Sequence, residues 1–170
     1  MIRVSVDGLD TVAATFGALP DQAERASKRA IRKATRSLAS RIGRGLAKTH
    51  GIPLKAVKSR RRVIVSRTTP GLVWVGYNPI AAIYLGNARQ LKTGVRIGSR
   101  RYDGAFLATM KSGHFGVFRR RGKSRLPIEE VKEPLTQTLA VIQTEKVSLE
   151  ERLLPQIYLQ ELNYEINVRR

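Results

Sequence analysis

Residues that could carry out proton transfer or nucleophilic chemistry are few in this chain of 170 residues. It has two histidines, His50 and His114, and no cysteine to form a nucleophilic pair or a thiolate metal site with either. Glu129 and Glu130 are adjacent, and we expect them to precede a helix, whose macrodipole explains them better than acid–base catalysis. No P-loop, HExxH or GxSxG motif occurs. The sequence therefore predicts no enzyme, no catalytic or metal site and no cofactor.

The densest functional chemistry is cationic and lies between residues 113 and 133. Five cations occupy seven positions: Arg119, Arg120, Arg121, Lys123 and Arg125. The β-prone residues Phe115, Val117 and Phe118 precede them, so the pattern predicts a strand that leads into a charged hairpin tip. Such a tip cannot lie in a core without acidic partners. It is either a solvated loop or a surface that meets another molecule.

The charge of the whole chain is +19 and is unevenly distributed. Residues 1–128 hold 27 Lys and Arg against 5 Asp and Glu, a net of +22, whereas residues 129–170 hold 5 against 8, a net of −3. Self-repulsion at this density destabilises a lone compact monomer. Two partners would relieve it: a polyanion, or the acidic end of another copy in a homo-oligomer.

Two further basic runs extend the candidate surface for DNA or for a neighbouring subunit. They are Arg60, Arg61 and Arg62, and Arg100 and Arg101, and they join the five cations of the predicted tip. The chain has no zinc-finger, RRM or KH signature, so any DNA contact is expected to be nonspecific and sensitive to salt.

The size and hydropathy of the chain favour one compact domain or a domain with an arm. Apolar residues make up 42% of the sequence, which is enough for a core. No apolar run approaches the roughly 20 residues that span a bilayer, and the N-terminus lacks a signal-peptide core. We therefore expect no membrane partner, and synthesis and use in the cytoplasm.

The first third of the chain is expected to be mainly helical. Alternation predicts a strand over residues 2–6, a turn at 7–8 and a short helix over 9–18. An Asp21–Glu24 capping box then predicts a long helix that ends near Lys48. Its apolar stripe is rich in alanine, which favours close packing against a sheet or another helix. The opposite face is strongly basic, and it is either solvated or an interface for acidic protein or phosphates.

The middle of the chain is expected to be mainly β. The pattern predicts a helical turn at 52–57, an antiparallel hairpin of 63–65 with 72–77 around a turn at 68–71, and strands over 93–98 and 105–110. Residues 99–104 read as a charged loop. Trp74 is expected to pack in the core or between subunits.

The C-terminal part is expected to form an acidic helical arm. Helical spacing begins at Leu135, Ser148 is a candidate cap for a second stretch, and Pro155 should kink or divide the helix. One aliphatic face forms a candidate docking helix, on its own domain or on a neighbour: Leu149, Leu153, Ile157, Leu162 and Ile166. The fold class is therefore α+β, with a core domain over residues 1–134 and a helical arm over 135–170.

Three segments resemble the phage minor tail protein Z family, also called tail completion proteins. The first is the order of strand, short helix and long basic helix at the N-terminus. The second is the run from Ile83 to Arg89, IYLGNAR, and the third runs from Gly104 through GHFGVFR to LPIEEVK, ending at Lys132. The likeness covers nearly the whole chain.

The resemblance implies a small α+β fold without enzymatic activity, in which a long helix packs on an antiparallel sheet with C-terminal helices. It implies a homo-oligomeric ring, expected to be hexameric, near the head-proximal end of a long tail, where it finishes the tail, helps to join it to the head and lets DNA pass. Expected partners are the tail terminator, tail tube or head-tail connector proteins, in the virion tail or neck after assembly in the host cytoplasm. The alternative is a nonspecific basic nucleic-acid-binding protein.

Overall fold

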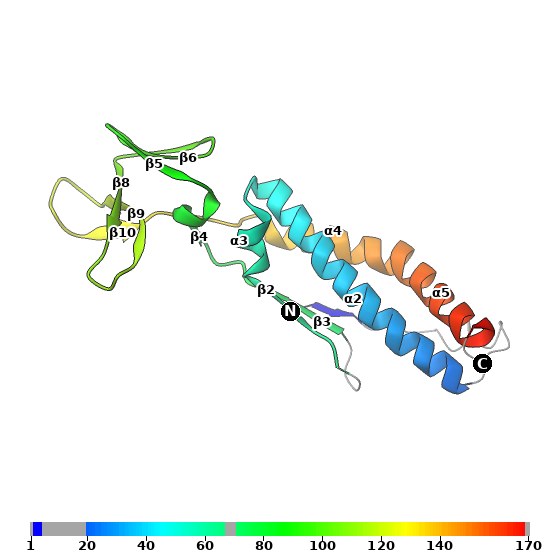
Figure 1. Cartoon of the computed structure of the whole chain (residues 1–170). Coiled ribbons are helices and arrows are strands. Elements are labelled where there is room, and N and C mark those ends of the chain that lie inside the picture. The colour runs from blue at the N-terminus through cyan, green and yellow to red at the C-terminus, as the bar shows by residue number, and fades with distance from the viewer. Residues whose placement is uncertain (1, 5–19, 67–70, 169–170) are drawn as a thin grey trace. The chain divides into compact units, whose positions relative to one another are not determined.

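The computed structural model describes residues 2–4, 20–66 and 71–168, and it has the predicted mixture of helices and antiparallel strands (Figure 1). The predicted turn at 7–8, the short helix over 9–18 and most of the turn at 68–71 lie outside these residues. The chain forms two compact units. We call Met1–Gly45, Arg60–Gly76 and Leu139–Arg170 the helical unit, and Leu46–Ser59 with Tyr77–Thr138 the strand unit. The domain boundary at residue 134 stays a prediction.

The long helix α2 spans Pro20–His50, close to the predicted range. Proline suits the first helical position because its fixed φ matches the helix and its missing N–H would have no partner there. Asp21 therefore lies in the first turn rather than before it, and the predicted capping box is wrong in its position. Gly51, with a φ of 56°, follows the last helical residue in the left-handed conformation that terminates many helices.

In the helical unit, the small apolar face of α2 is buried against a three-stranded sheet and the C-terminal helix. The buried residues of this face are Ala23, Ala26, Ala30, Ala34, Leu38 and Ile42. The sheet has the antiparallel order β1 (Ile2–Val4), β3 (Gly71–Val75), β2 (Arg61–Ile64). A Cβ built on Gly71 would lie 1.8 Å from Thr35 Oγ1, so glycine lets β3 approach α2 closely.

The hairpin of β2 and β3 confirms the predicted antiparallel pair, but one expectation about its side chains is wrong. Trp74 is 45% exposed and lies opposite Arg62 on the outer side of the hairpin rather than in the core. The alternation along β3 explains this, since Val73 next to it is fully buried. Packing of Trp74 between subunits stays a prediction.

The C-terminal part is helical, as predicted. α4 covers Thr138–Ser148, a π-helical turn η2 covers Leu149–Leu153, and α5 covers Leu154–Asn167. Ser148 has right-handed helical dihedrals and makes no capping bond, so the predicted cap is wrong. The change from π to α geometry comes directly before Pro155, which agrees with the predicted division of the helix. α5 lies alongside the first half of α2 (Figure 1).

The strand unit holds the remaining elements. They are α3 (Leu54–Lys58), β4 (Ile80–Ala81), η1 (Ala82–Leu85), β5 (Ala88–Leu91), β6 (Gly94–Ile97), β7 (Arg100–Asp103), β8 (Ala105–Thr109), β9 (Phe115–Arg120), β10 (Ile128–Glu130) and β11 (Lys132–Glu133). They form antiparallel sheets in the orders β5-β6-β7, β10-β9-β8 and β11-β4.

Two predictions for the strand unit are wrong. The expected loop over residues 99–104 is largely strand β7, because turns at Gly98 and Gly104, with φ of 56° and 69°, bring it alongside β6 and bury Tyr102. Glu129 and Glu130 do not precede a helix, because they lie on β10, paired with β9. The helical turn at α3 and the strands at β6, β8 and β9 are confirmed.

Candidate nucleic-acid interface

The predicted basic tip lies at the end of the β9–β10 hairpin. Arg119 lies opposite Glu129 in the ladder, and Arg121 Nε lies 3.7 Å from the Glu129 carboxylate while its side chain is 74% exposed. Arg120 donates to the carbonyl of Arg125, and its guanidinium lies 5.5 Å from the centre of the Phe106 ring. One carboxylate therefore neutralises the tip only weakly, because exposed ion pairs contribute little.

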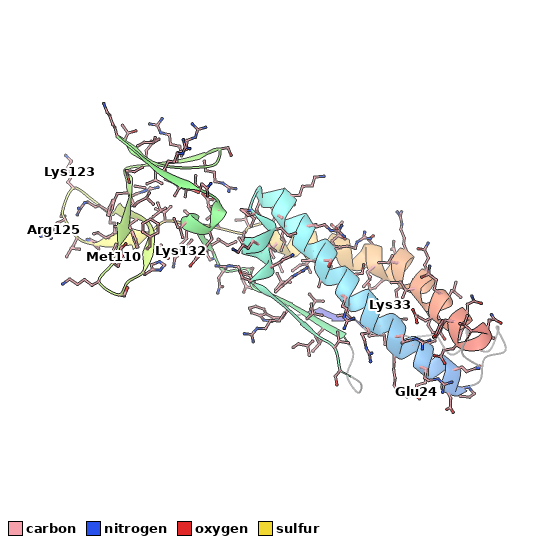
Figure 2. The ribbon with its side chains drawn as sticks, in the orientation of Figure 1. Glu24, Lys33, Met110, Lys123, Arg125 and Lys132 are labelled. Atoms are coloured by element: carbon pink, nitrogen blue, oxygen red, sulfur yellow. The ribbon has the colours of Figure 1, made fainter. Side chains whose placement is uncertain are left out.

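Lys123 and Arg125 occupy the loop between β9 and β10, and their side chains point out from it (Figure 2). Both residues are exposed, and neither has a carboxylate within ion-pair distance in the described part of the chain. The loop can therefore present two cations to a phosphate backbone or to an acidic neighbour.

The second predicted pair, Arg100 and Arg101, divides into two roles. Arg100 donates to the carbonyls of His50 and Gly51, the latter at 3.3 Å, at the C-terminal end of α2. A cation there satisfies carbonyls that the helix leaves unpaired. Arg101 is exposed on β7 and lies 2.7 Å from both Asp103 Oδ1 and Thr93 Oγ1. Only Arg101 faces solvent as a candidate ligand-binding group.

The first predicted run, Arg60 to Arg62, belongs to the helical unit, whereas the other seven candidate cations belong to the strand unit. Arg61 donates to the carbonyl of Ala39 on α2 and so anchors β2 to the helix. Arg62 is exposed opposite Trp74. The ten candidate cations are therefore divided between the two units, three in the helical unit and seven in the strand unit.

Two exposed arginines of the strand unit were missed in the sequence. Arg89 on β5 and Arg96 on β6 lie directly opposite each other in the ladder. The alternation of Val95, Arg96 and Ile97 contains a signal for an outward arginine on a half-buried strand. The pairing of β5 with β6 brings Arg89 beside it.

Three cations on the basic face of α2, Arg25, Arg29 and Lys33, pair with glutamates of α5, whereas Arg36 and Arg44 on this face are exposed. Arg25 Nε lies 2.8 Å from Glu165 Oε2, and Arg29 Nε lies 2.6 Å from Glu161 Oε2. Arg29 also pairs with Glu165, and Lys33 pairs with Glu161. The glutamate side chains are 7% exposed for Glu161 and fully buried for Glu165. These three cations therefore pair within the chain, and a contact of the basic face with another acidic protein or with phosphates stays a prediction.

The ion pairs between α2 and α5 shift the pKa values of Glu161 and Arg29. Burial alone would raise the pKa of Glu161, but hydrogen bonds from Lys33 and Arg29 outweigh burial and hold this pKa below its ordinary value. Burial likewise works against the charge of Arg29, while Glu161 and Glu165 raise the pKa of Arg29 above its ordinary value. Both groups are therefore charged at neutral pH, as buried partners that satisfy each other must be.

The predicted docking residues of the C-terminal arm contact their own helical unit. Leu149 and Leu162 are buried, and Ile157 and Ile166 pack against a cluster formed by Ala26, Ala30, Tyr158 and Leu162. Leu153 is half-buried. Docking of these residues on a neighbouring subunit stays a prediction.

The two histidines differ in their contacts. His114, in the turn between β8 and β9, has its Nε2 2.8 Å from Glu130 Oε1 on β10. The pKa of His50 is lowered by burial and by the nearby Arg100. Among the residues that the structure describes, no group of three His, Asp or Glu side chains could hold a metal, and no helix is long and apolar enough to cross a membrane.

Comparison with known proteins decides the family. The family described as "Prophage minor tail protein Z (GPZ)" matches residues 6–169, which is nearly the whole chain. The chain belongs to this family. The resemblance seen in the sequence is thereby confirmed, and membership makes the chain a structural protein of phage tails.

One relative extends the comparison. The "Tail completion protein" of Escherichia phage N15 is 32% identical over 153 residues, which cover 81% of this chain and 79% of the relative. No solved structure matches the chain.

Proposed function

We propose that this minor tail protein Z family member is a tail completion protein of a long-tailed phage. The observation that carries the proposal is the 32% identity to a tail completion protein over most of both chains. In this role the chain is a structural subunit that finishes the tail and helps to join it to the head.

We further propose a homo-oligomeric ring at the head-proximal end of the tail, expected to be hexameric, through which DNA passes. The exposed apolar residues of α4 and α5 support a contact with a tail terminator, tail tube or connector protein. They include Leu139 at 72% exposure, Val147 at 44% and Tyr164 at 45%. Glu161 and Glu165 already pair within the chain, so a contact between copies would use these outer surfaces rather than those glutamates.

A complementation experiment tests the tail function. Phage that lack this gene are expected to accumulate filled heads and separate tails, and the intact chain supplied in trans should restore joined virions. Electron micrographs of lysates and plaque counts give the readout. Normal virions without the gene would contradict the proposal.

The ring needs its own measurement, which is the mass of the purified chain by mass photometry, alone and with extract that contains tails. The proposal predicts a discrete oligomer or a complex with tails. A monomer under both conditions would contradict the ring.

The alternative is a nonspecific nucleic-acid-binding protein, which the net charge of +19 and the exposed basic tip favour. Charge reversal at Arg119, Arg120 and Arg121 separates the two functions. If DNA affinity is lost while virions form normally, the alternative is favoured. If virions fail to form while DNA affinity is intact, the tail function is favoured.

A further inference from the structure

Three arginines form a straight row across the β5-β6-β7 sheet. Arg89 on β5 lies opposite Arg96 on β6, and Arg96 lies opposite Arg101 on β7. All three residues are exposed. We call Arg89, Arg96 and Arg101 the arginine row.

The fold holds this row on the outer face of the sheet. Val95 and Ile97, which flank Arg96 on β6, are buried, and so is Tyr102, the neighbour of Arg101 on β7. The Tyr102 hydroxyl donates to Glu133 Oε1 at 2.8 Å, which fixes β7 from its inner side. Because side chains alternate along a strand, the three arginines point away from this inner face.

The row is unfavourable for the isolated protein. Like charges directly opposite on neighbouring strands destabilise a sheet. In the described part of the chain, Asp103 is the one carboxylate that lies within ion-pair distance of the row, and it contacts Arg101 at 2.7 Å. Arg96 Nε donates to the carbonyl of Gly98 at 3.1 Å, which leaves its charge uncompensated. A ligand with several negative charges would relieve the repulsion.

We propose that the arginine row binds consecutive phosphates of a nucleic acid backbone that runs across the strands. Neighbouring strands lie about 4.8 Å apart, so the row spans roughly 10 Å. Each strand of a duplex carries one phosphate per about 3.4 Å of helix axis and winds around that axis, so consecutive phosphates lie farther apart than this rise, and the long arginine side chains can reach two or three of them. Guanidinium groups suit this ligand because they bind phosphate in a two-pronged manner.

A nucleic acid suits the row because the three arginines follow one another across neighbouring strands, and a backbone presents its phosphates in a regular succession. The inference rests on the proposed function for its ligand, since DNA is the polyphosphate that passes through a tail. The inference adds Arg89 and Arg96 to the candidate DNA-binding cations, and it specifies that the backbone runs across strands β5, β6 and β7.

The test is the affinity of the full chain for a DNA duplex of about 20 base pairs, measured by fluorescence anisotropy between about 50 and 200 mM salt. The variant R89Q/R96Q/R101Q is expected to lower the affinity at the lowest salt at least tenfold. The slope of log affinity against log salt should fall by about 2 to 3, because each phosphate contact contributes about 0.9. An unchanged slope and affinity would overturn the inference.

A matched control removes the same charge from another place in the strand unit. K48Q/K55Q/K58Q neutralises three exposed lysines on the last turn of α2 and on α3. It should lower the affinity less than threefold. If this control loses as much affinity as the row variant, net charge rather than the row binds the DNA, and the inference is overturned.

Two further measurements sharpen the assignment. R89K/R96K/R101K keeps the charges and should retain most of the salt slope, so a slope as low as that of the glutamine variant would contradict charge neutralisation by the row. Poly-L-glutamate should compete only weakly with the duplex. Competition at equal charge concentration would favour an acidic protein partner and overturn the phosphate assignment.

Folding of the row variant is checked by its melting temperature, which should equal or exceed that of the unaltered chain.

Complementation separates this inference from the proposed function. Lost DNA affinity with normal virions supports the row and contradicts a role for its DNA contact in the tail. Unchanged affinity in a variant that blocks virion formation overturns the row and leaves the tail function standing.

Discussion

The basic face of α2 and the arginine row have similar sequence chemistry and opposite surroundings. On α2, Arg29 contacts two glutamates of α5 and has a side chain that is 26% exposed. On the β5-β6-β7 sheet, Arg96 is exposed and its neighbours across both ladders are arginines. Arg29 and the other cations paired with α5 therefore stabilise the fold, whereas the arginine row remains available to a partner.

This difference shows that net charge alone does not locate a binding surface. A cation that pairs with a buried carboxylate is held in place, because separating the pair would leave an unpaired charge with little access to water. An exposed cation without a buried carboxylate beside it keeps a charge that a ligand can reach. For this chain with a charge of +19, the arginine row is therefore a better candidate surface for a polyanion than the part of α2 that pairs with α5.

The largest expected effect comes from breaking the buried cluster. Glu165→Ala removes a fully buried carboxylate and leaves Arg25 and Arg29 without it. We expect a loss of about 3 kcal/mol in the free energy of unfolding of the helical unit, at the lower end for buried pairs because both arginines are partly exposed. Urea unfolding followed by circular dichroism measures this loss.

The matched control for this change is Glu24→Ala, which breaks the exposed pair with Lys28 one turn along α2. Exposed pairs of this kind contribute little, so the unfolding midpoint should not move measurably. Equal effects of the two substitutions would show that α5 does not depend on the buried cluster.

The next largest effect is expected in the strand unit from Gly94→Ala. A Cβ at Gly94 would lie 2.2 Å from the backbone oxygen of Tyr102, which cannot move without shifting β7. We expect a loss of about 1 to 3 kcal/mol and weaker DNA binding, since the position of Arg101 depends on β7. Thermal melting and anisotropy measure the two effects. Gly122→Ala, where a Cβ meets no atom within 4 Å, is the control.

Acidification should weaken the helical unit. The folded-state pKa of Glu161 is depressed, so its contribution to stability is present above its unfolded pKa of about 4.3 and is lost as the pH falls through the folded value. The unfolding midpoint of the helical unit should therefore fall below about pH 4.5. Glu161→Gln should flatten this dependence, and an unaltered pH profile in that variant would contradict the assignment.

The smallest effect has the opposite sign. Arg96→Gln removes the central member of the arginine row and two repulsive neighbours. We expect a gain of about 0.2 to 1 kcal/mol in stability, the range for cross-strand pairs. Differential scanning calorimetry measures it. A loss of stability would show that Arg96 contributes more through its contacts than it loses through repulsion.

Local patterns in the sequence were sufficient to predict the α+β class, the range of α2, the β2–β3 hairpin and the basic tip, because each depends on neighbouring residues. The strand at Arg100–Asp103 was missed because three of its four residues are charged, and Tyr102 is its one buried side chain, so no apolar alternation marks it as a strand. Burial of that ring and its bond to Glu133 are long-range, and no local pattern contains them.

The two charge arrangements differ in how far they could have been predicted. Arg25, Arg29 and Lys33 repeat every four residues, and Glu161 and Glu165 have the same spacing, so matched faces of two antiparallel helices could have been inferred. The arginine row depends on the register of three strands. Register is fixed by turns and by the buried face, so separate arginines in the sequence give no sign of their alignment.

The most direct test of the account is the rate at which an arginine-selective reagent such as phenylglyoxal modifies each arginine, measured by mass spectrometry with and without duplex DNA. The account predicts slow modification of Arg29 in both conditions, and fast modification of Arg89, Arg96 and Arg101 that DNA slows. DNA that protects arginines of α2 while leaving the arginine row equally reactive would contradict the central claim that the strand unit carries the surface for a polyanion.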